Sequence, residues 1–172
     1  MTFHEIYEQH HKAVFNLALQ YVQNASDAEE ITQEVFLQIY RKLHVFEHRA
    51  ELSTWIYRIT VNKSIDHLRK IKRIKHMIGF FPFLADVLHV REPSMLDHPG
   101  AMLENKEALK KIYECINRLP ARQKTVIILL KIQGLRQADA ASIMGLTEKA
   151  LESLLQRARK NLKKFLDDTE EK

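Results

Sequence analysis

The sequence is poor in the residues that interrupt or cross-link a chain, with four glycines, four prolines and one cysteine among 172 residues. Because glycine and proline are the strongest local structure breakers, their scarcity leaves little turn punctuation and favours long helices. A lone Cys115 excludes an internal disulfide and a cysteine-based zinc site. Nothing therefore favours an oxidising compartment, and we expect the protein to act in the cytoplasm.

Long hydrophobic runs are also missing. The first eleven residues are polar, whereas a secretory signal needs a basic start and an apolar run of about 7–15 residues. The most hydrophobic stretch, 77–90, is interrupted by Pro82, Asp86 and His89 and is shorter than the roughly 20 residues that span a bilayer. We expect neither export nor a membrane anchor.

The residues that are abundant indicate an all-α protein with a polyanionic partner. The hydrophobic content of 45% is enough to build real cores, and long stretches are rich in good helix formers. Lysine and arginine number 27 against 22 acidic residues, which gives a net charge of +5 and a pI near 9.3. This excess is modest, so the placement of the charges carries more information than their sum.

Three amphipathic helices are predicted in the first part of the chain. Thr2 and Glu5 have capping-box spacing, and a helical stripe then runs to about residue 23 through Ile6, Val14, Leu17 and Tyr21. Ser26 and Glu29 predict a second capping box, followed by a stripe of Ile31, Val35, Ile39 and Leu43. Two helices joined by so tight a turn should pack antiparallel.

A loop is expected over 44–52, and a third helix, capped by Ser53 or Thr54, is expected to run to about Lys70 or beyond. At 100° per residue its apolar side comprises Tyr57, Val61, Ile65 and Leu68, whereas Trp55, Asn62, Asp66 and Arg69 share the opposite side.

The helical pattern lapses in the middle of the chain, which predicts two domains, 1–75 and 104–172, joined by a linker over 76–103. In the second domain Leu109, Ile112, Ile116 and Leu119 form a stripe that Pro120 ends. The run 125–132 has the composition of a strand, but no partner strand exists elsewhere, so we predict a helix there.

The strongest local signal is a helix-turn-helix over 140–155. Ala141 permits close helix approach, Gly145 accepts the turn, and Leu151 with Leu154 or Leu155 fixes the second helix on the first. The face opposite these leucines is polar and suits a DNA major groove: Lys149, Glu152, Ser153, Gln156, Arg157 and Lys160. A helical hairpin with a solvated face remains the alternative.

Two charged tracts suggest partners for the first domain. The tract 63–75 holds six basic residues against Asp66 and follows Trp55, a combination that suits single-stranded nucleic acid, although a lone tryptophan is more often a core residue. Over 22–40 the charge is acidic, with Asp27, Glu29, Glu30 and Glu34, and a basic protein surface is the natural partner. The dipole of a helix N-terminus explains the first three acids but not Glu34.

No catalytic or cofactor motif is present. The sequence lacks a P-loop, a dinucleotide-binding glycine loop and a nucleophile elbow. Its nine histidines include the pairs His10 with His11 and His44 with His48, but neither pair has a convincing third ligand. We therefore expect a protein that is not an enzyme and that needs neither metal nor cofactor.

Three segments, in this order, resemble the extracytoplasmic-function (ECF) RNA polymerase sigma factors. DAEEITQEVFLQIYRKL (27–43) is similar to the polymerase-binding helix of that family, and STWIYRITVNKSIDHLRK (53–70) to its promoter-melting helix. The stretch from 119 to 166 is similar to its minus-thirty-five-reading domain. Glu152 and Leu154 depart from the Lys and Arg of many members, which leaves the target sequence open.

The resemblance implies an all-α, two-domain initiation factor that binds core RNA polymerase and promoter DNA, serves a stress or envelope response, and is held in check by an anti-sigma factor. It implies a polymerase-binding set of Asp27, Glu30, Gln33 and Glu34. The minus-ten set is Trp55, Arg58, Asn62, Asp66 and Arg69, helped by the loop 44–52. The minus-thirty-five set is Lys149, Glu152, Ser153, Gln156, Arg157 and Lys160.

Two other functions remain open. A stand-alone helix-turn-helix regulator needs only 104–172 and leaves the acidic helix and Trp55 without a role. A helical scaffold or anti-regulator needs no DNA at all, and weak, salt-independent retention on heparin would identify it.

Overall fold

The computed structural model describes residues 2–46, 51–80 and 103–170, and every regular element in these ranges is helical. The chain divides into two compact units, Met1–Leu96 and Asp97–Lys172, and this division falls inside the predicted linker 76–103. The all-α fold class with two helical domains is confirmed. None of the described helices combines the length and the hydropathy needed to cross a membrane.

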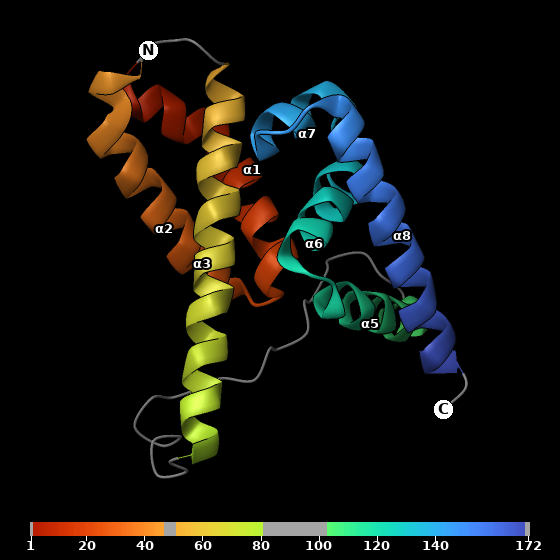
Figure 1. Ribbon diagram of the computed structural model, residues 1–172. Coiled ribbons are helices and arrows are strands. Elements are labelled where there is room, and N and C mark those ends of the chain that lie inside the picture. Colours follow the sequence, from red (N-terminus) through yellow and green to blue (C-terminus); the bar gives the residue numbers. More distant parts are fainter. Residues whose placement is uncertain (1, 47–50, 81–102, 171–172) are drawn as a thin grey trace. The chain divides into compact units, whose positions relative to one another are not determined.

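The first unit is a bundle of three helices, α1 (Phe3–Val22), α2 (Ala25–Lys42) and α3 (Leu52–Phe80), which pack pairwise against one another (Figure 1). A short 3₁₀ helix, η1 (Leu43–Val45), follows α2. The stripes predicted for the first two helices are confirmed as core, because all of their members but the last are buried: Ile6, Val14, Leu17, Tyr21, Ile31, Val35 and Ile39.

Of the two predicted capping boxes, the one at Thr2 is confirmed and the one at Ser26 is not. The Thr2 hydroxyl accepts a hydrogen bond from the Glu5 amide, and the Glu5 carboxylate accepts one from the Thr2 amide, at 3.3 and 2.8 Å. The predicted cap at Ser26 is wrong, because the buried side chain of Asn24 accepts the hydrogen bond from the Asp27 amide at 3.0 Å. Gln23 ends α1 in a left-handed conformation with φ of 55°, and α2 begins at Ala25, two residues earlier than predicted.

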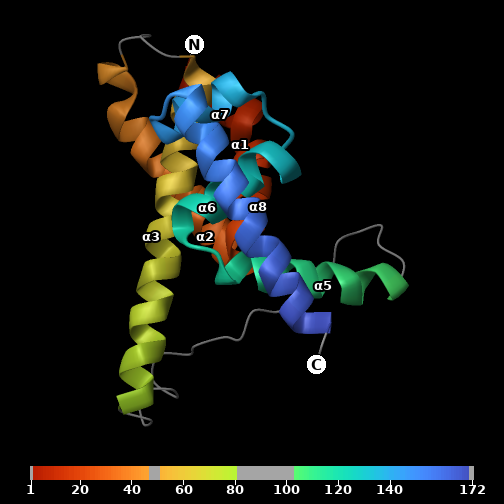
Figure 2. The same cartoon turned by 45° about the vertical axis from the view of Figure 1, so that its right-hand side comes forward.

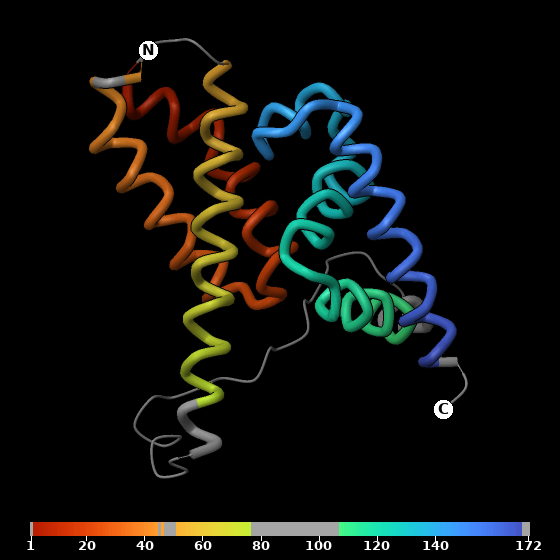
Figure 3. The backbone as a smooth tube through the Cα atoms, in the orientation of Figure 1, coloured from red at the N-terminus to blue at the C-terminus, as the bar shows by residue number. Residues whose placement is uncertain are grey.

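Helix α3 is rotated slightly from the predicted orientation, and it is longer. Of the predicted apolar side only Val61 is fully buried, and Ile56, Thr60 and Ser64 occupy the core. The two hydroxyls are tolerated there because each donates to a carbonyl one turn earlier, at 2.9 and 2.8 Å. The helix begins at Leu52, before the predicted caps, and its C-terminal turns extend beyond α1 and α2 (Figure 3).

The second unit contains α5 (Leu103–Arg118), α6 (Ala121–Ile127), η2 (Ile128–Ile132), α7 (Gln137–Met144) and α8 (Glu148–Glu170), shown in Figure 2. The run 125–132 is helical, as predicted, and ends in a π-helical turn. Its apolar side chains pack with those of α8 in the core, which also contains Cys115, Ile116, Leu119, Ala140, Ala141 and Ile143.

The predicted helix-turn-helix is present and consists of α7 and α8. Gly145 ends α7 in a left-handed conformation with φ of 62°, and the Leu146 amide donates to the Ala141 carbonyl at 2.9 Å. This is the hydrogen bond of a Schellman-type helix end. Thr147 then caps α8 by accepting a hydrogen bond from the Ala150 amide at 3.2 Å. The sharp turn fixes the direction in which α8 leaves α7.

A buried lysine lies in the core of the second unit. Lys124 on α6 is only 5% exposed, and its ammonium donates to the Asn117 side-chain oxygen at 2.6 Å. Burial lowers the pKa of Lys124 from its usual 10.5 to about 8. Because the folded state disfavours the charged form, this residue lowers stability below pH 8, and the penalty fades as the pH rises from about 8 to 10.5.

Replacing Lys124 by methionine is therefore expected to raise the free energy of unfolding at pH 7, by at most about 3 kcal/mol. It should also remove the gain in stability that the wild type shows between pH 8 and 10. Urea unfolding of the full chain, followed by far-UV circular dichroism, measures both effects. A variant that is no more stable than the wild type at pH 7 would contradict the expectation.

Candidate nucleic-acid and protein interfaces

The outer face of α2 combines acidic and apolar side chains. Glu30, Gln33 and Glu34 are exposed, and Leu37 follows them one turn later with 56% of its surface exposed. Tyr40 is 66% exposed near the end of the helix. Protein interfaces combine apolar area with polar groups around it, and Leu37 and Tyr40 supply apolar area beside the polar groups of this face. This face therefore has the composition of a protein-docking surface.

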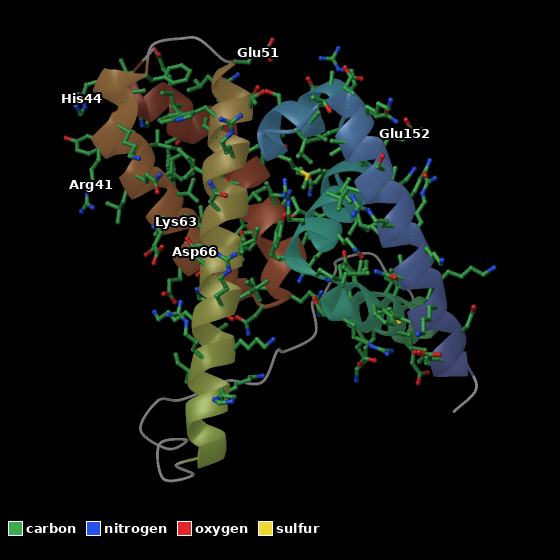
Figure 4. The ribbon with its side chains drawn as sticks, viewed as in Figure 1. Arg41, His44, Glu51, Lys63, Asp66 and Glu152 are labelled. Carbon is green, nitrogen blue, oxygen red and sulfur yellow. The ribbon has the colours of Figure 1, made fainter. Side chains whose placement is uncertain are left out.

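Two of the four predicted polymerase-binding residues also contact α3. The Glu34 carboxylate accepts a hydrogen bond from the Lys63 ammonium at 2.9 Å, and the Asp27 carboxylate lies 3.7 Å from Nε2 of His67. Figure 4 shows Lys63 beside α2. The Glu34–Lys63 ion pair joins α2 to α3 and partly neutralises the acidic face. Glu30 and Gln33 remain as its exposed polar groups without a described partner.

The residues predicted for the minus-ten element do share one side of α3. Arg58, Asn62, Asp66 and Arg69 are all exposed, and Trp55 is half-buried at the N-terminal end of the same side. Asp66 and Arg69 form an exposed ion pair with an N–O distance of 3.2 Å. The face therefore offers carboxylate, amide and guanidinium groups beside an aromatic ring, which suits bases that have left the stack.

Trp55 is half-buried, so it is neither a core residue nor a fully exposed one. Its ring packs against Phe46, which follows η1, with centroids 4.8 Å apart and planes tilted by 33°. Phe46 thereby fixes one end of the segment that connects α2 to α3. Part of the predicted loop, residues 47–50, lies outside the described residues, and residues 44–45 belong to η1.

The six residues predicted for the minus-thirty-five element are brought together on α8. All six are exposed, whereas Leu151, Leu154, Leu155 and Ala158 on the opposite side are buried. Glu152 projects from the N-terminal part of this helix (Figure 4). The helix thus presents an uninterrupted polar face over three turns, supported from behind by apolar contacts.

Local hydrogen bonds involve side chains on both helices of the helix-turn-helix. The Ser153 hydroxyl donates to the Lys149 carbonyl at 3.0 Å, which leaves the oxygen free to accept. At the start of α7, Arg136 donates to Asp139 at 2.8 Å, and this hydrogen bond holds the pKa of the Asp139 carboxyl below its usual value. This ion pair is neutral overall, so it adds no net charge to the helix-turn-helix.

Sequence reasoning missed the exposed Leu37 and Tyr40 and the Glu34–Lys63 pair. The exposure of Leu37 and Tyr40 follows from the helical period, because both residues fall outside the buried stripe of Ile31, Val35 and Ile39. The ion pair joins residues 29 positions apart, and no local pattern indicates it.

Family profiles match both units. The profile described as Sigma-70 region 2 matches residues 6–74, and the profile described as Sigma-70, region 4 matches residues 109–162. The first range contains both faces on α2 and α3, and the second contains the helix-turn-helix.

Known proteins resemble the chain over nearly its whole length. The sigma factor SigZ of Bacillus subtilis is 30% identical over 169 residues, which cover 97% of this chain and 88% of that protein. The ECF sigma factor SigX of the same species is 28% identical over 96% of this chain and 84% of its own length. Among solved structures, the sigma factor RpoE in its complex with the anti-sigma factor NepR from Bartonella quintana has a TM-score of 0.67, 25% identity and 96% coverage of both chains. The chain therefore belongs to the extracytoplasmic-function RNA polymerase sigma factors.

Proposed function

We propose that this sigma factor docks on core RNA polymerase through α2, opens the minus-ten element with α3, and reads the minus-thirty-five element with α8. It carries out no chemical step of its own and acts where the polymerase is, in the cytoplasm. The observation that carries the proposal is the exposure of all six polar residues along α8 above a buried apolar side. A helix built in this way on a helix-turn-helix is suited to the major groove of duplex DNA.

Docking on polymerase is assigned to Glu30, Gln33, Glu34 and Leu37. An exposed leucine supplies apolar area at the centre, and the carboxylates favour a basic partner and speed its encounter. Asp27 stays in the predicted set, and its carboxylate also lies 3.7 Å from Nε2 of His67 on α3.

The same α2 surface is the natural target for an inhibitor. The RpoE structure includes an anti-sigma factor, and the likeness at 25% identity supports an anti-sigma factor for this chain. A protein that covered Leu37 and Glu30 would block polymerase binding by competition.

The direct test is transcription from a genomic library by core polymerase with and without the purified chain. We expect transcripts that start at a small set of defined sites only when the chain is present. Operator-like DNA binding without any effect on initiation would favour the stand-alone regulator instead. Failure to bind DNA or polymerase would favour a scaffold.

Charge reversal at Glu30 tests the docking surface most sharply, because this exposed carboxylate has no described partner within the chain. Glu30→Lys is expected to weaken the affinity for core polymerase by about tenfold, which corresponds to about 1.4 kcal/mol, and to slow association most at low salt. Fluorescence anisotropy of the labelled chain titrated with core polymerase measures this. The matched control is Glu8→Lys, an equal charge change at an exposed position of α1. Equal affinities of the two variants would remove Glu30 from the interface.

A further inference from the structure

A buried histidine on α3 faces the acidic helix α2, and none of the three surfaces above uses it. The His67 side chain is only 9% exposed, and its buried Nε2 atom has no hydrogen-bond partner among the described residues. The Asp27 carboxylate lies 3.7 Å from this nitrogen, which is too far for a hydrogen bond. Because buried polar atoms are nearly always hydrogen-bonded, an unsatisfied ring nitrogen beside a carboxylate requires an explanation.

The two charge states of the ring differ in what they offer Asp27. A neutral imidazole has one N–H group and one lone pair, so its Nε2 atom is either an unsatisfied donor or a lone pair that faces a negative carboxylate. A protonated ring donates from both nitrogens and balances the charge of the carboxylate. An N–H···O bond between such charged groups spans about 2.7–2.9 Å. Protonation should therefore draw the two side chains together by about 1 Å.

On α1 and α2, Asp27 is the only acid within 4 Å of the ring among the described residues. Residues 13–24, which form the C-terminal part of α1 and the cap of α2, include no acid, lysine, arginine or histidine, and Tyr21 is their only titratable side chain. The other acids on the same side of α2 are Glu30, which is exposed, and Glu34, which is already paired. Asp27 is thus the carboxylate that can stabilise a protonated ring.

The charged neighbours on α3 do not replace Asp27. The cations one turn away are Lys63 and Lys70. Lys63 is neutralised by its ion pair with α2, beside which it lies in Figure 4, and Lys70 is exposed, so water and salt screen its charge. Asp66 is exposed and pairs with Arg69. A proton on the buried ring therefore meets one close countercharge, which comes from α2.

Asp27 connects this ring to the docking surface, because it belongs to the predicted polymerase-binding set. Its side chain is 34% exposed, so the carboxylate is accessible to a partner while it also lies beside the ring. A carboxylate in a charged hydrogen bond with the ring no longer offers a free negative charge to a basic protein. Histidine is the side chain whose charge ordinarily changes between about pH 5 and 8. The charge of the docking surface can thus depend on pH.

We propose that His67 makes polymerase docking sensitive to pH. In mildly acidic conditions the protonated ring donates to Asp27, draws the carboxylate toward α3 and removes one charge from the acidic face. At higher pH the neutral ring leaves the carboxylate to the partner. By linkage, docking favours the neutral ring and releases its proton to solvent. The proposal rests on the docking role of α2 given above.

The test measures the affinity of the labelled full chain for core polymerase at about pH 5.5 and at about pH 8, on either side of the usual histidine range. Because groups on polymerase also titrate, each variant is compared with wild type at the same pH. His67→Gln keeps a polar side chain without a charge. We expect it to bind like wild type at the higher pH and about two- to fivefold more tightly at the lower pH, the factor for one partly exposed charge pair.

Asp27→Asn should behave in the opposite way, with weaker binding than wild type at the higher pH and equal binding at the lower pH. The control variant is His4→Gln, which removes another titratable ring from an exposed position on α1 and should keep the wild-type pH profile. The same pH profile for wild type and His67→Gln would overturn the proposal. A gain at low pH that persists when Asp27→Asn is combined with His67→Gln would also overturn it, because the ring would then act through another group.

A direct measurement covers the case in which the buried position does not tolerate glutamine. In the NMR spectrum of the free chain, the Cε1 shift of His67 should titrate at lower pH in Asp27→Asn than in wild type, because the carboxylate favours the charged ring. Identical titrations would overturn the ion pair, whatever the binding data show. If wild type bound core polymerase at neither pH, the proposed docking would fail, and the coupling with it, even where the titration shows the ion pair.

Discussion

Replacing Trp55 by alanine is expected to slow the opening of a duplex promoter by about 5- to 150-fold, while binding to core polymerase stays unchanged. This range follows from the loss of about 1–3 kcal/mol when an aromatic side chain that stacks on a base is removed. Trp55 is half-buried beside Phe46, at the end of the exposed side of α3 that includes Asn62. Flipping a base out of the duplex costs a few kcal/mol of lost stacking. Stacking of that base on the Trp55 ring offsets part of this free energy.

Because Trp55 also packs on Phe46, the alanine variant could lose local structure, and two further variants separate the roles. Trp55→Phe keeps an aromatic platform and should retain most of the opening rate. Asn62→Ala removes an exposed amide without touching the core and should slow opening more mildly. The rate is measured with a fluorescent base in the minus-ten element. On a pre-melted template the defects should largely disappear, and defects of the same size there would show that this face does not act on opening.

The local patterns of the sequence were enough to predict most of the fold. The stripes of α1 and α2 repeat with the helical period and include residues such as Leu17 and Val35 that are fully buried. The rotation of α3 was harder, because Thr60 and Ser64 look polar in the sequence but satisfy their hydroxyls within the helix. A periodicity argument assigns such residues to the surface, although their small size lets two helices approach closely.

The candidate surfaces could be predicted from the sequence where their residues lie within one helix. The polar face of α8 lies within one helix behind a glycine turn, so spacing alone places Lys149 and Gln156 on one side. On α2 the spacing places Glu34 correctly, but its partner Lys63 comes from another helix. Long-range pairs of this kind depend on how the helices pack, and the acidic face is therefore less acidic than the sequence suggests.

The other large effect is expected at Glu152, near the centre of the exposed polar face of α8. A carboxylate close to DNA is repelled by phosphates, so it is useful there mainly as an acceptor for a base, and cytosine N4 is the best-matched donor. Glu152 is exposed, and its neighbours on the face include Lys149 and Gln156. Glu152→Ala should relax the preference at one base pair, by about 1–3 kcal/mol, and change the salt dependence little.

Lys163 and Lys164, exposed farther along α8, supply the matched contrast. Neutralising either one, if it touches a phosphate, should weaken binding to every sequence and lower the slope of log affinity against log salt by about 0.9. Selection of bound promoter variants from a randomised minus-thirty-five pool distinguishes the two kinds of residue. The Glu152 variant should lose information at one position, whereas the lysine variants should keep the wild-type preferences at lower affinity. Identical base preferences for wild type and Glu152→Ala would place Glu152 on a solvated part of the helix, because a carboxylate that accepts from a base cannot be removed without loss of discrimination there.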